Sequence, residues 1–267
     1  MKKIIALILA LALVLTFAGC GANEPADNSS NASSNDADAK ITTVKEGKLT
    51  MATNAYFQPY EYYDGDKIVG IDAEIADAIA KKLGLELVIE DMAFDSIITA
   101  VQEGSVDIGL AGMTVKPDRL EKVDFSVSYA NGVQVVIVPE NSKIATVDDL
   151  FADGATYKAG VQLGTTGDAY ASEDLGADRV TQYPNGNEAV NALIGGDVDC
   201  VIIDNEPAKS FVANNKGLKI LETTYADEDY AACIKKGNKA LLDAVNNAID
   251  ELMEDGTIDN IIGKYIK

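Results

Sequence analysis

An arginine, an aspartate and a short run of threonines each follow an apolar segment of this sequence, and together they could hold a zwitterion. Arg119 comes just after the turn-like sequence Gly112-Met113-Thr114, and its guanidinium fork matches a carboxylate with two parallel hydrogen bonds. Gly164-Thr165-Thr166-Gly167 would place hydroxyls and free backbone N–H groups at the start of a helix, which suits an anion. Asp204 ends another apolar segment and could accept from an ammonium group.

Each of these signals also has a plainer interpretation. Arg119 could pair at the surface with Asp118 or Glu121, and the glycine–threonine run could simply cap a helix. The aromatic residues between Asn54 and Tyr63 could form a wall for a small ligand or pack a hairpin onto the body. Asp64 and Asp66 could begin a calcium loop, but the later ligands and the closing glutamate are missing, so a plain Asp-Gly turn is favoured.

Composition excludes several classes of function. The chain has 267 residues and is 47% hydrophobic, so it can build one large domain or two small ones. Its 43 acidic residues against 22 basic ones give a net charge of -21, which argues against a nucleic-acid partner. There is no histidine, so Ser-His and Cys-His catalysis and histidine-ligated metals are excluded. Three cysteines cannot form a disulfide framework.

The N-terminal residues have the pattern that is typical of a targeting segment. Two lysines precede an apolar run at 4–17, which is short for a membrane span. The run ends in Phe17-Ala18-Gly19-Cys20, which resembles a bacterial lipobox and implies cleavage before a lipid-bearing (palmitate-carrying) Cys20. An ordinary signal peptide that happens to contain a cysteine is the alternative. Residues 21–39 are rich in Asn, Ser, Asp and Ala, which is typical of a flexible tether.

Strand and helix patterns alternate along the rest of the chain, which favours an α/β fold with mostly parallel strands. Asp72 could cap the helix expected at 72–83, and the stripe Leu241, Val245, Ile249 and Met253 is expected to pack in the core. Strands are expected at 49–53, 85–89, 106–111, 133–138, 157–161, 180–183, 198–204 and 230–234, with a hairpin at 62–69. Helices are expected at 72–83, 94–102, 147–151, 187–194, 207–213, 239–254 and 258–266, with another opening at 164–167.

The alternation falls into two runs of similar length, which suggests two lobes. In open α/β sheets, ligands bind beyond the carboxyl ends of the strands. The residues after the expected strands are therefore the ones to examine, and they include Asn54, Thr114, Gln162 and Asp204.

Several short motifs occur in a characteristic order. They are Pro59-Tyr60-Glu61, Val69-Gly70-Ile71-Asp72, Phe94-Asp95-Ser96-Ile97-Ile98, Ala111-Gly112-Met113-Thr114, Pro117-Asp118-Arg119, Val123-Asp124-Phe125-Ser126, Gly164-Thr165-Thr166-Gly167 and Gly256-Thr257. This order and spacing, from about 48 to 267, resembles the family 3 extracellular solute-binding proteins of ABC importers, the polar amino-acid receptors.

The resemblance implies a role for each site residue. Arg119 would bind the α-carboxylate with help from Thr165 and Thr166, and Asp204 would bind the α-ammonium. Gly112 and Thr114 would touch either group, while Phe57 and Phe94 would flank the ligand side chain. Asn54 and Gln162 complete the expected site at the side-chain end.

The resemblance also implies a type II periplasmic-binding fold with two lobes, a mixed and mostly parallel sheet in each lobe, and a two-stranded hinge. The expected parts are a signal peptide at 1–19, a lipidated Cys20 and linker at 20–40, a discontinuous first lobe at 41–128 and 231–267, a second lobe at 133–226, and crossovers at 129–132 and 227–230. A monomer anchored on the extracytoplasmic side of a bacterial cell membrane would close on an amino acid and present it to an ABC permease. No catalysis, cofactor, metal or nucleic acid is expected.

The nature of the side chain that binds is less sharply indicated. Receptors for cationic amino acids often carry Asp where this chain has Asn54, and Gln162 adds a second neutral amide. A neutral polar ligand is therefore favoured, with arginine or lysine as the alternative if Glu61 or Asp95 supplies charge. The rival functions are a ligand-sensing domain and a small lyase or dehydratase, whose general acid would be Glu206 or Glu61.

Overall fold

The computed structural model describes residues 41–222 and 224–267, which belong to one structural unit of the chain. The predicted signal peptide, the lipid attachment at Cys20 and the linker lie outside the described residues. Within the described part, no helix is long and apolar enough to cross a membrane.

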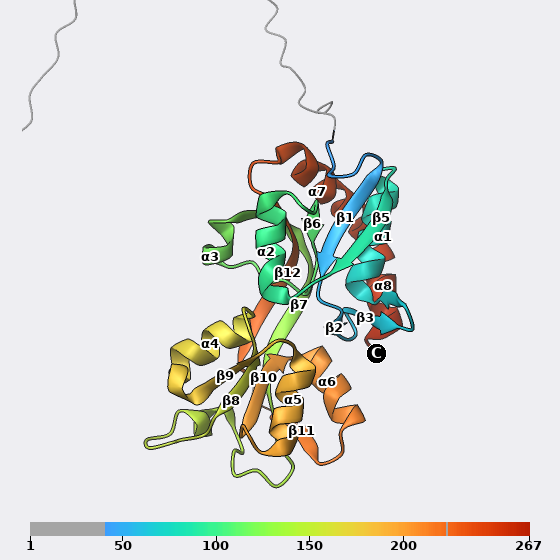
Figure 1. The fold of residues 1–267 in the computed structure, drawn as a ribbon. Helices are drawn as coiled ribbons and strands as arrows, with labels where there is room; N and C mark the ends of the chain where they lie inside the picture. Colours follow the sequence, from blue (N-terminus) through green and yellow to red (C-terminus); the bar gives the residue numbers. More distant parts are fainter. Residues whose placement is uncertain (1–40, 223) are drawn as a thin grey trace, which may run out of the picture. The chain divides into compact units, whose positions relative to one another are not determined.

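Two long antiparallel strands run through the sheet and connect its two lobes (Figure 1). β7 (Val123–Pro139) pairs with β12 (Ala226–Lys235) from Val123–Lys235 to Gln134–Ala226. The full strand order is β5-β1-β6-β12-β7-β10-β8-β9, and β11 also pairs with β7. The two-lobed α/β fold with a two-stranded hinge is thereby confirmed, while the exact lobe boundaries stay predictions.

The first lobe is built on parallel strands. β1 pairs with β5 and β6 in parallel, and β6 meets β12 in an antiparallel register. Its elements are β1 (Lys48–Thr53), α1 (Ile71–Lys82), β5 (Glu86–Asp91), α2 (Phe94–Glu103), β6 (Ile108–Gly109), α3 (Pro117–Leu120), α7 (Lys239–Glu254) and α8 (Thr257–Tyr265). A separate small sheet is formed by β2 (Tyr56–Phe57), β3 (Glu61–Asp64) and β4 (Lys67–Val69).

The second lobe repeats this plan. β8 pairs with β10 and β9 in parallel, and β10 is antiparallel to the C-terminal part of β7. Its elements are η2 (Val147–Leu150), β8 (Ala159–Gln162), α4 (Thr166–Leu175), η3 (Ala177–Arg179), β9 (Val180–Tyr183), α5 (Gly186–Gly195), β10 (Cys200–Asp204), α6 (Asn205–Asn214) and β11 (Leu218–Ile220).

Helices cover both faces of the sheet because alternate strand residues point to opposite sides. In the first lobe, buried residues of α1, α7 and α8 pack with Leu49 and Met51, whereas those of α2 pack with Ala52 and Cys233. In the second lobe α5 and α6 share one core and α4 another. Cys233 and Cys200 are both buried and free.

Three predicted strands have clearly different lengths in the structure. The strand expected at 230–234 is β12, which begins at Ala226 and so includes the crossover expected at 227–230. The segment 106–111 forms only the two-residue strand β6, because its residues beyond Gly109 turn toward the pocket described below. Conversely, the strand expected at 133–138 begins at Val123 and continues without interruption to Pro139. The crossover expected at 129–132 is therefore part of a continuous strand, held by its register with β12.

Two individual residues also differ from expectation. Asp72 does not cap α1, because Gly70 occupies the N-cap position and the Asp72 carboxylate is buried inside the lobe. Met253 does not join the core stripe of α7, since 45% of it is exposed. Leu252 and Ala248 are buried there instead, because the apolar face of a helix drifts from a strict four-residue spacing. The Asp-Gly turn is as predicted, with Asp64 paired to Lys67.

Candidate functional site

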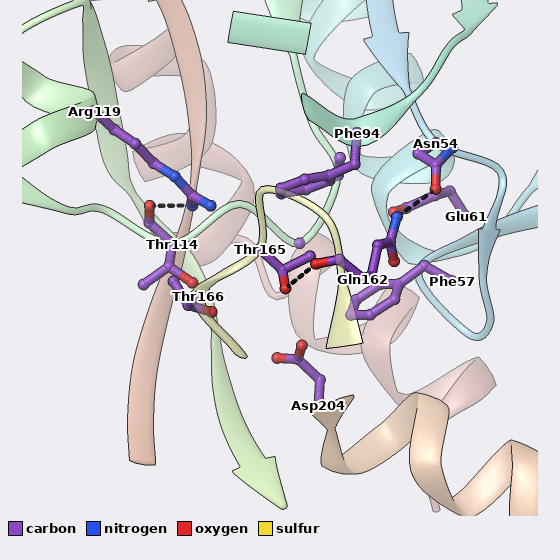
Figure 2. A pocket seen from close by; sticks show the side chains of 12 residues that line it. Asn54, Phe57, Glu61, Phe94, Thr114, Arg119, Gln162, Thr165, Thr166 and Asp204 are labelled. Atoms are coloured by element: carbon purple, nitrogen blue, oxygen red, sulfur yellow. Dashed lines mark hydrogen bonds between the residues drawn. The ribbon is translucent and has the colours of Figure 1, made fainter. Parts of the chain in front are cut away.

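All ten residues expected at the site line one pocket between the two lobes. Its empty space is about 320 Å³, including the mouth. The first lobe contributes Asn54, Phe57, Phe94, Gly112, Thr114 and Arg119, together with the unexpected Glu61 and Ala111, and the second lobe contributes Gln162, Thr165, Thr166 and Asp204. Figure 2 shows Arg119, Thr114 and Thr166 on one side, Asn54, Glu61 and Gln162 on the other, and Phe94 between them.

Strand ends position these side chains. Asn54 follows β1, Gln162 ends β8 and Asp204 ends β10. Since β8 and β10 are parallel neighbours, their carboxyl ends reach the same edge of the sheet. The pocket therefore lies where the strand-end rule predicts it.

Arg119 is held in place by backbone oxygens and by the ring of Phe94, over which its guanidinium lies at 5.5 Å from the centroid. It is 5% exposed, and its two terminal nitrogens donate to the carbonyl of Thr114 at 2.8 Å and to that of Gly164 at 3.1 Å. It does not pair with Asp118 or Glu121, as the plainer interpretation supposed, and it forms no ion pair with any described residue. Burial lowers the pKa of this guanidinium. A buried cation without a counter-ion is prepared to bind an anion.

Asp204 is the opposing charge. The Gln134 side chain on β7 donates to its Oδ2 at 2.8 Å, and the Tyr230 hydroxyl on β12 donates to Oδ1. Burial is the main reason that the pKa of Asp204 is raised well above its ordinary value, and the charge on Glu228 adds to it. A cation beside this carboxylate would be strongly favoured, because its positive charge stabilises the ionised form that burial and Glu228 disfavour.

Thr165 and Thr166 begin α4. Thr165 is the N-cap: its hydroxyl accepts from the Asp168 backbone N–H at 3.2 Å and donates to the Gln162 carbonyl at 2.8 Å. Both the capping interpretation and the pocket location therefore hold for Thr165. Thr166 is 4% exposed and lines the pocket at the first turn of the helix, where the helix dipole favours negative charge.

At the other end of the pocket, two amides pair across the lobes. The Gln162 side chain donates to Asn54 Oδ1 at 2.9 Å, and Asn54 donates in turn to the Met92 carbonyl at 2.8 Å. The aromatic cluster divides its roles: Phe57 lines the pocket and packs against Tyr60, while Tyr56 and Tyr63 are exposed.

A pair of buried carboxyl groups lies under this end. Glu61 and Asp72 are 1% and 0% exposed, and Asp72 Oδ2 accepts from the Gly112 backbone at 2.8 Å and from the Tyr129 hydroxyl at 2.8 Å. Neither Glu61 oxygen nor Asp72 Oδ1 receives a donor from the described residues. Burial and the neighbouring charge raise the pKa of Glu61 well above its ordinary value, and burial raises the pKa of Asp72 to about 6. A proton on either carboxyl group would supply the missing donor.

Several buried residues that support the pocket side chains were not among those expected at the site. Asp72, Tyr129, Gln134 and Glu228 do not line the pocket, but all four are buried beside it. Gln134 gave a usable signal, because it is the polar residue in the otherwise apolar segment 133–138. Of the charges considered for the ligand side chain, Glu61 lines the pocket and Asp95 is exposed outside it.

The family model of bacterial extracellular solute-binding proteins, family 3, matches residues 49–267. The chain belongs to this family. It is similar over 99% of its length to two curated proteins: a probable histidine-binding protein of Neisseria gonorrhoeae, at 31% identity over 96% of that protein, and the arginine-binding extracellular protein ArtP of Bacillus subtilis (strain 168), at 32% identity over 98%.

Solved structures show the same fold for this solute-binding protein. An ancestral arginine-binding protein, determined with glutamine and separately with arginine, aligns with a TM-score of 0.77 and 38% identity, covering 83% of this chain and 99% of that one. The family resemblance predicted from the motifs is thus confirmed, and the roles of the individual site residues stay predictions.

Proposed function

We propose that this protein binds a polar amino acid between its lobes, prefers one with a cationic side chain, and delivers it to an ABC permease. The observation that supports this best is the arrangement of charge in the pocket, with Arg119 on one side, Glu61 on the other and Asp204 apart from both. The family to which the chain belongs consists of extracellular solute-binding proteins.

Arg119 and Asp204 together suit the α-carboxylate and α-ammonium groups of every L-amino acid. Arg119 has no counter-ion among the described residues, and Asp204 has only neutral hydrogen-bond partners there. A ligand carboxylate and ammonium would complete both charges. Because Arg119 and Asp204 come from different lobes, one amino acid would bridge them and shift the population of molecules toward the closed form.

The side of the pocket that holds Glu61 favours a cation. The carboxyl groups of Glu61, Asp72, Asp204 and Glu228 are all buried in or beside the pocket, whereas Arg119 is the buried cation among the described residues. A cationic side chain near Glu61 would partly balance this excess. The argument for a neutral ligand rested on Asn54 and Gln162, but one hydrogen bond between these amides and another from Asn54 to the Met92 carbonyl already occupy part of their capacity. The alternative carried by Glu61 is therefore the better supported one.

The names of the relatives include both cationic and neutral amino acids. One curated relative is named as arginine-binding and another as probably histidine-binding, and the ancestral protein was determined with both arginine and glutamine. In this chain Glu61 would suit either ligand, because a carboxyl group donates to an amide oxygen when it is protonated and pairs with a cation when it is ionised.

Titration calorimetry with L-arginine, L-lysine, L-glutamine and L-glutamate tests the proposal. Wild type should bind arginine or lysine most tightly, and Glu61→Gln should weaken arginine at least tenfold while changing glutamine little, because only the cation loses a charge partner. Glu86→Gln is the matched control, since Glu86 is an exposed residue paired with Lys48 away from the pocket. Equal affinity of both proteins for arginine would overturn the cationic preference; no binding of any amino acid would overturn the receptor function itself.

Arginine binding should also release a proton. Burial and the neighbouring Asp72 raise the pKa of Glu61 well above its ordinary value, and a guanidinium beside the group would lower that pKa again. Calorimetry in two buffers of different ionisation enthalpy measures this directly. Arginine should release more protons than glutamine, and Glu61→Gln should remove the difference.

A lyase or dehydratase on this scaffold would need a general acid in the pocket. Of the two candidates, Glu61 lines the pocket with a raised pKa, whereas Glu206 does not line it and pairs with Lys209 at 2.6 Å. The named relatives reported above are binding proteins. Recovery of unchanged arginine after long incubation, followed by NMR, is the expected result; a new product would favour the enzyme.

Anchoring at the outer face of the membrane through Cys20 is part of the proposal. It rests on the lipobox-like Phe17-Ala18-Gly19-Cys20. Metabolic labelling with a palmitate analogue in a bacterial host should label the wild type and not Cys20→Ser. Labelling of both would contradict the anchor, and size-exclusion chromatography with light scattering tests the expected monomer.

A further inference from the structure

One amide nitrogen serves two carboxylates at the hinge. Gln134 Nε2 lies 2.8 Å from Asp204 Oδ2, 3.0 Å from Glu228 Oε2 and 3.4 Å from the Thr166 hydroxyl. An amide nitrogen has only two hydrogens to donate, so the three acceptors compete for them. Asp204 and Glu228 are therefore held side by side with one neutral donor between them.

Glu228 has no evident structural reason to be charged. It is 6% exposed, forms no ion pair with any described residue, and its Oε1 has no donor within the described ranges. It does not line the pocket, so it would not touch a ligand directly. A buried carboxylate with a single neutral donor is stabilised when a cation arrives nearby.

The hinge strands hold this cluster. Gln134 is on β7, Glu228 is on β12, and Glu228 pairs in register with Gly132. A Cβ at Gly132 would lie 2.3 Å from the Tyr230 hydroxyl, so the missing side chain leaves room for the ring that donates to Asp204. Two residues of the crossing strand β12 therefore reach the carboxylate at the end of β10.

We propose that Glu228 is a positioning residue for the ligand's ammonium group: with Asp204 it forms a paired-carboxylate site whose repulsion is relieved when the ammonium arrives. This inference rests on the proposed amino-acid receptor function. An ammonium bound at Asp204 would also stabilise the charge of Glu228, so a residue of the strand that connects the lobes would contribute to the affinity.

Asp204 would be the group whose titration reports the effect. The charge on Glu228 contributes to the raised pKa of Asp204, after burial. A protonated Asp204 no longer attracts an ammonium, so affinity should fall as the pH drops through this pKa. Removing the Glu228 charge lowers the pKa of Asp204 and should move the acid loss of binding to lower pH. The other titratable and charged groups that face the pair are Arg119 from α3, Tyr170 from α4, Tyr230 from β12, and Tyr60, Glu61 and Glu206 on the Asp204 side.

The test is the affinity for L-arginine as a function of pH, for wild type, Glu228→Gln and Glu228→Asp. Glutamine keeps the size of the side chain and an acceptor for Gln134, so the fold should be retained, which thermal unfolding checks first. At neutral pH Glu228→Gln should bind roughly tenfold more weakly, yet lose affinity at lower pH than wild type does. Glu228→Asp retains the charge and should keep the wild-type midpoint.

Glu222→Gln is the control, because it removes the same charge from an exposed residue shortly before β12. It should leave both the affinity and the midpoint unchanged. A weaker Glu228→Gln with an unmoved midpoint would mean a purely structural role and would overturn the inference, as would an unchanged affinity. Wild type that fails to bind arginine and glutamine alike would instead overturn the receptor function.

Discussion

The two ends of the pocket hold their polar groups in different ways. The charges of Arg119 and Asp204 are each fixed by neutral partners: the guanidinium by two backbone carbonyls, and Asp204 by an amide and a phenol. Near Asn54, one amide hydrogen bond crosses the lobes and two buried carboxyl groups have raised pKa values.

This difference separates general affinity from specificity. Fixed charges without counter-ions suit the carboxylate and ammonium that every amino acid carries, and they need no rearrangement on binding. The opposite end can change on binding, because the hydrogen bond between Gln162 and Asn54 can break and a buried carboxyl group can gain or lose a proton. Changes at the first end should therefore weaken all ligands together, whereas changes at the second should reorder them.

The largest expected effect is the loss of Arg119. Arg119→Ala would leave the ligand carboxylate buried without a partner, which should cost on the order of 2–5 kcal/mol for every amino acid that binds. Isothermal titration calorimetry measures this. Arg179→Ala is the matched control, since Arg179 also donates to two backbone carbonyls but lies away from the pocket. If Arg119→Ala bound within about threefold of wild type, Arg119 would not be the carboxylate anchor.

A second effect concerns stability and the carboxyl pair. Burial raises the pKa of Asp72 from 3.8 to about 6, so the folded protein binds more protons than the unfolded chain between these values. Stability should therefore decrease as the pH rises through this window, by roughly 3 kcal/mol for this group. Asp72→Asn removes the titration and can still accept from Gly112 and Tyr129 through its amide oxygen.

Denaturant unfolding at pH 4 and at pH 8, without ligand, checks the sign. The variant should gain stability relative to wild type on going from pH 4 to pH 8. Glu74→Gln is a useful comparison, because Glu74 pairs with Lys264 and its pKa is lowered, which predicts the opposite trend. A stability difference between Asp72→Asn and wild type that did not change with pH would contradict the raised pKa of Asp72.

The sequence was a good guide wherever chain-local rules decide the structure. Helix α7 occupies the predicted 239–254, and Gly104 and Gly256 adopt the positive φ that ends or begins a helix. The strand-end rule pointed to pocket residues such as Thr114, Gln162 and Asp204, because the direction of a parallel strand fixes which of its ends faces the pocket. The aromatic run after the first strand contained Phe57, and the family resemblance then supplied Phe94, which no local rule selects.

Contacts between distant segments could not be predicted in this way. Asp72 looked like a helix cap because its neighbours in sequence are helical, but Gly112 and Tyr129 approach it from elsewhere in the fold. The pairing of Gln162 with Asn54 joins residues 108 positions apart. No local pattern marks Glu228, and only the register of β12 on β7 places it, buried, beside the amide that also binds Asp204.

The smallest expected effect is a reordering of ligands at Asn54. Asn54→Asp keeps the acceptor for Gln162 but replaces the donor to the Met92 carbonyl by a second oxygen. The added charge stands at the same end of the pocket as Glu61, so it should strengthen a cationic side chain by roughly 1–3 kcal/mol, disfavour an acidic one and change glutamine little.

Competition binding of arginine, glutamine and glutamate to wild type and Asn54→Asp measures the ranking. Asn185→Asp is the control, because it adds the same charge at a helix cap of the second lobe, where aspartate also caps well. If the ranking stays unchanged, Asn54 does not determine which ligand side chain the pocket prefers. If all three ligands weaken equally, Asn54 acts as a structural link to Met92, and the division between a fixed end and an adaptable end fails at this residue.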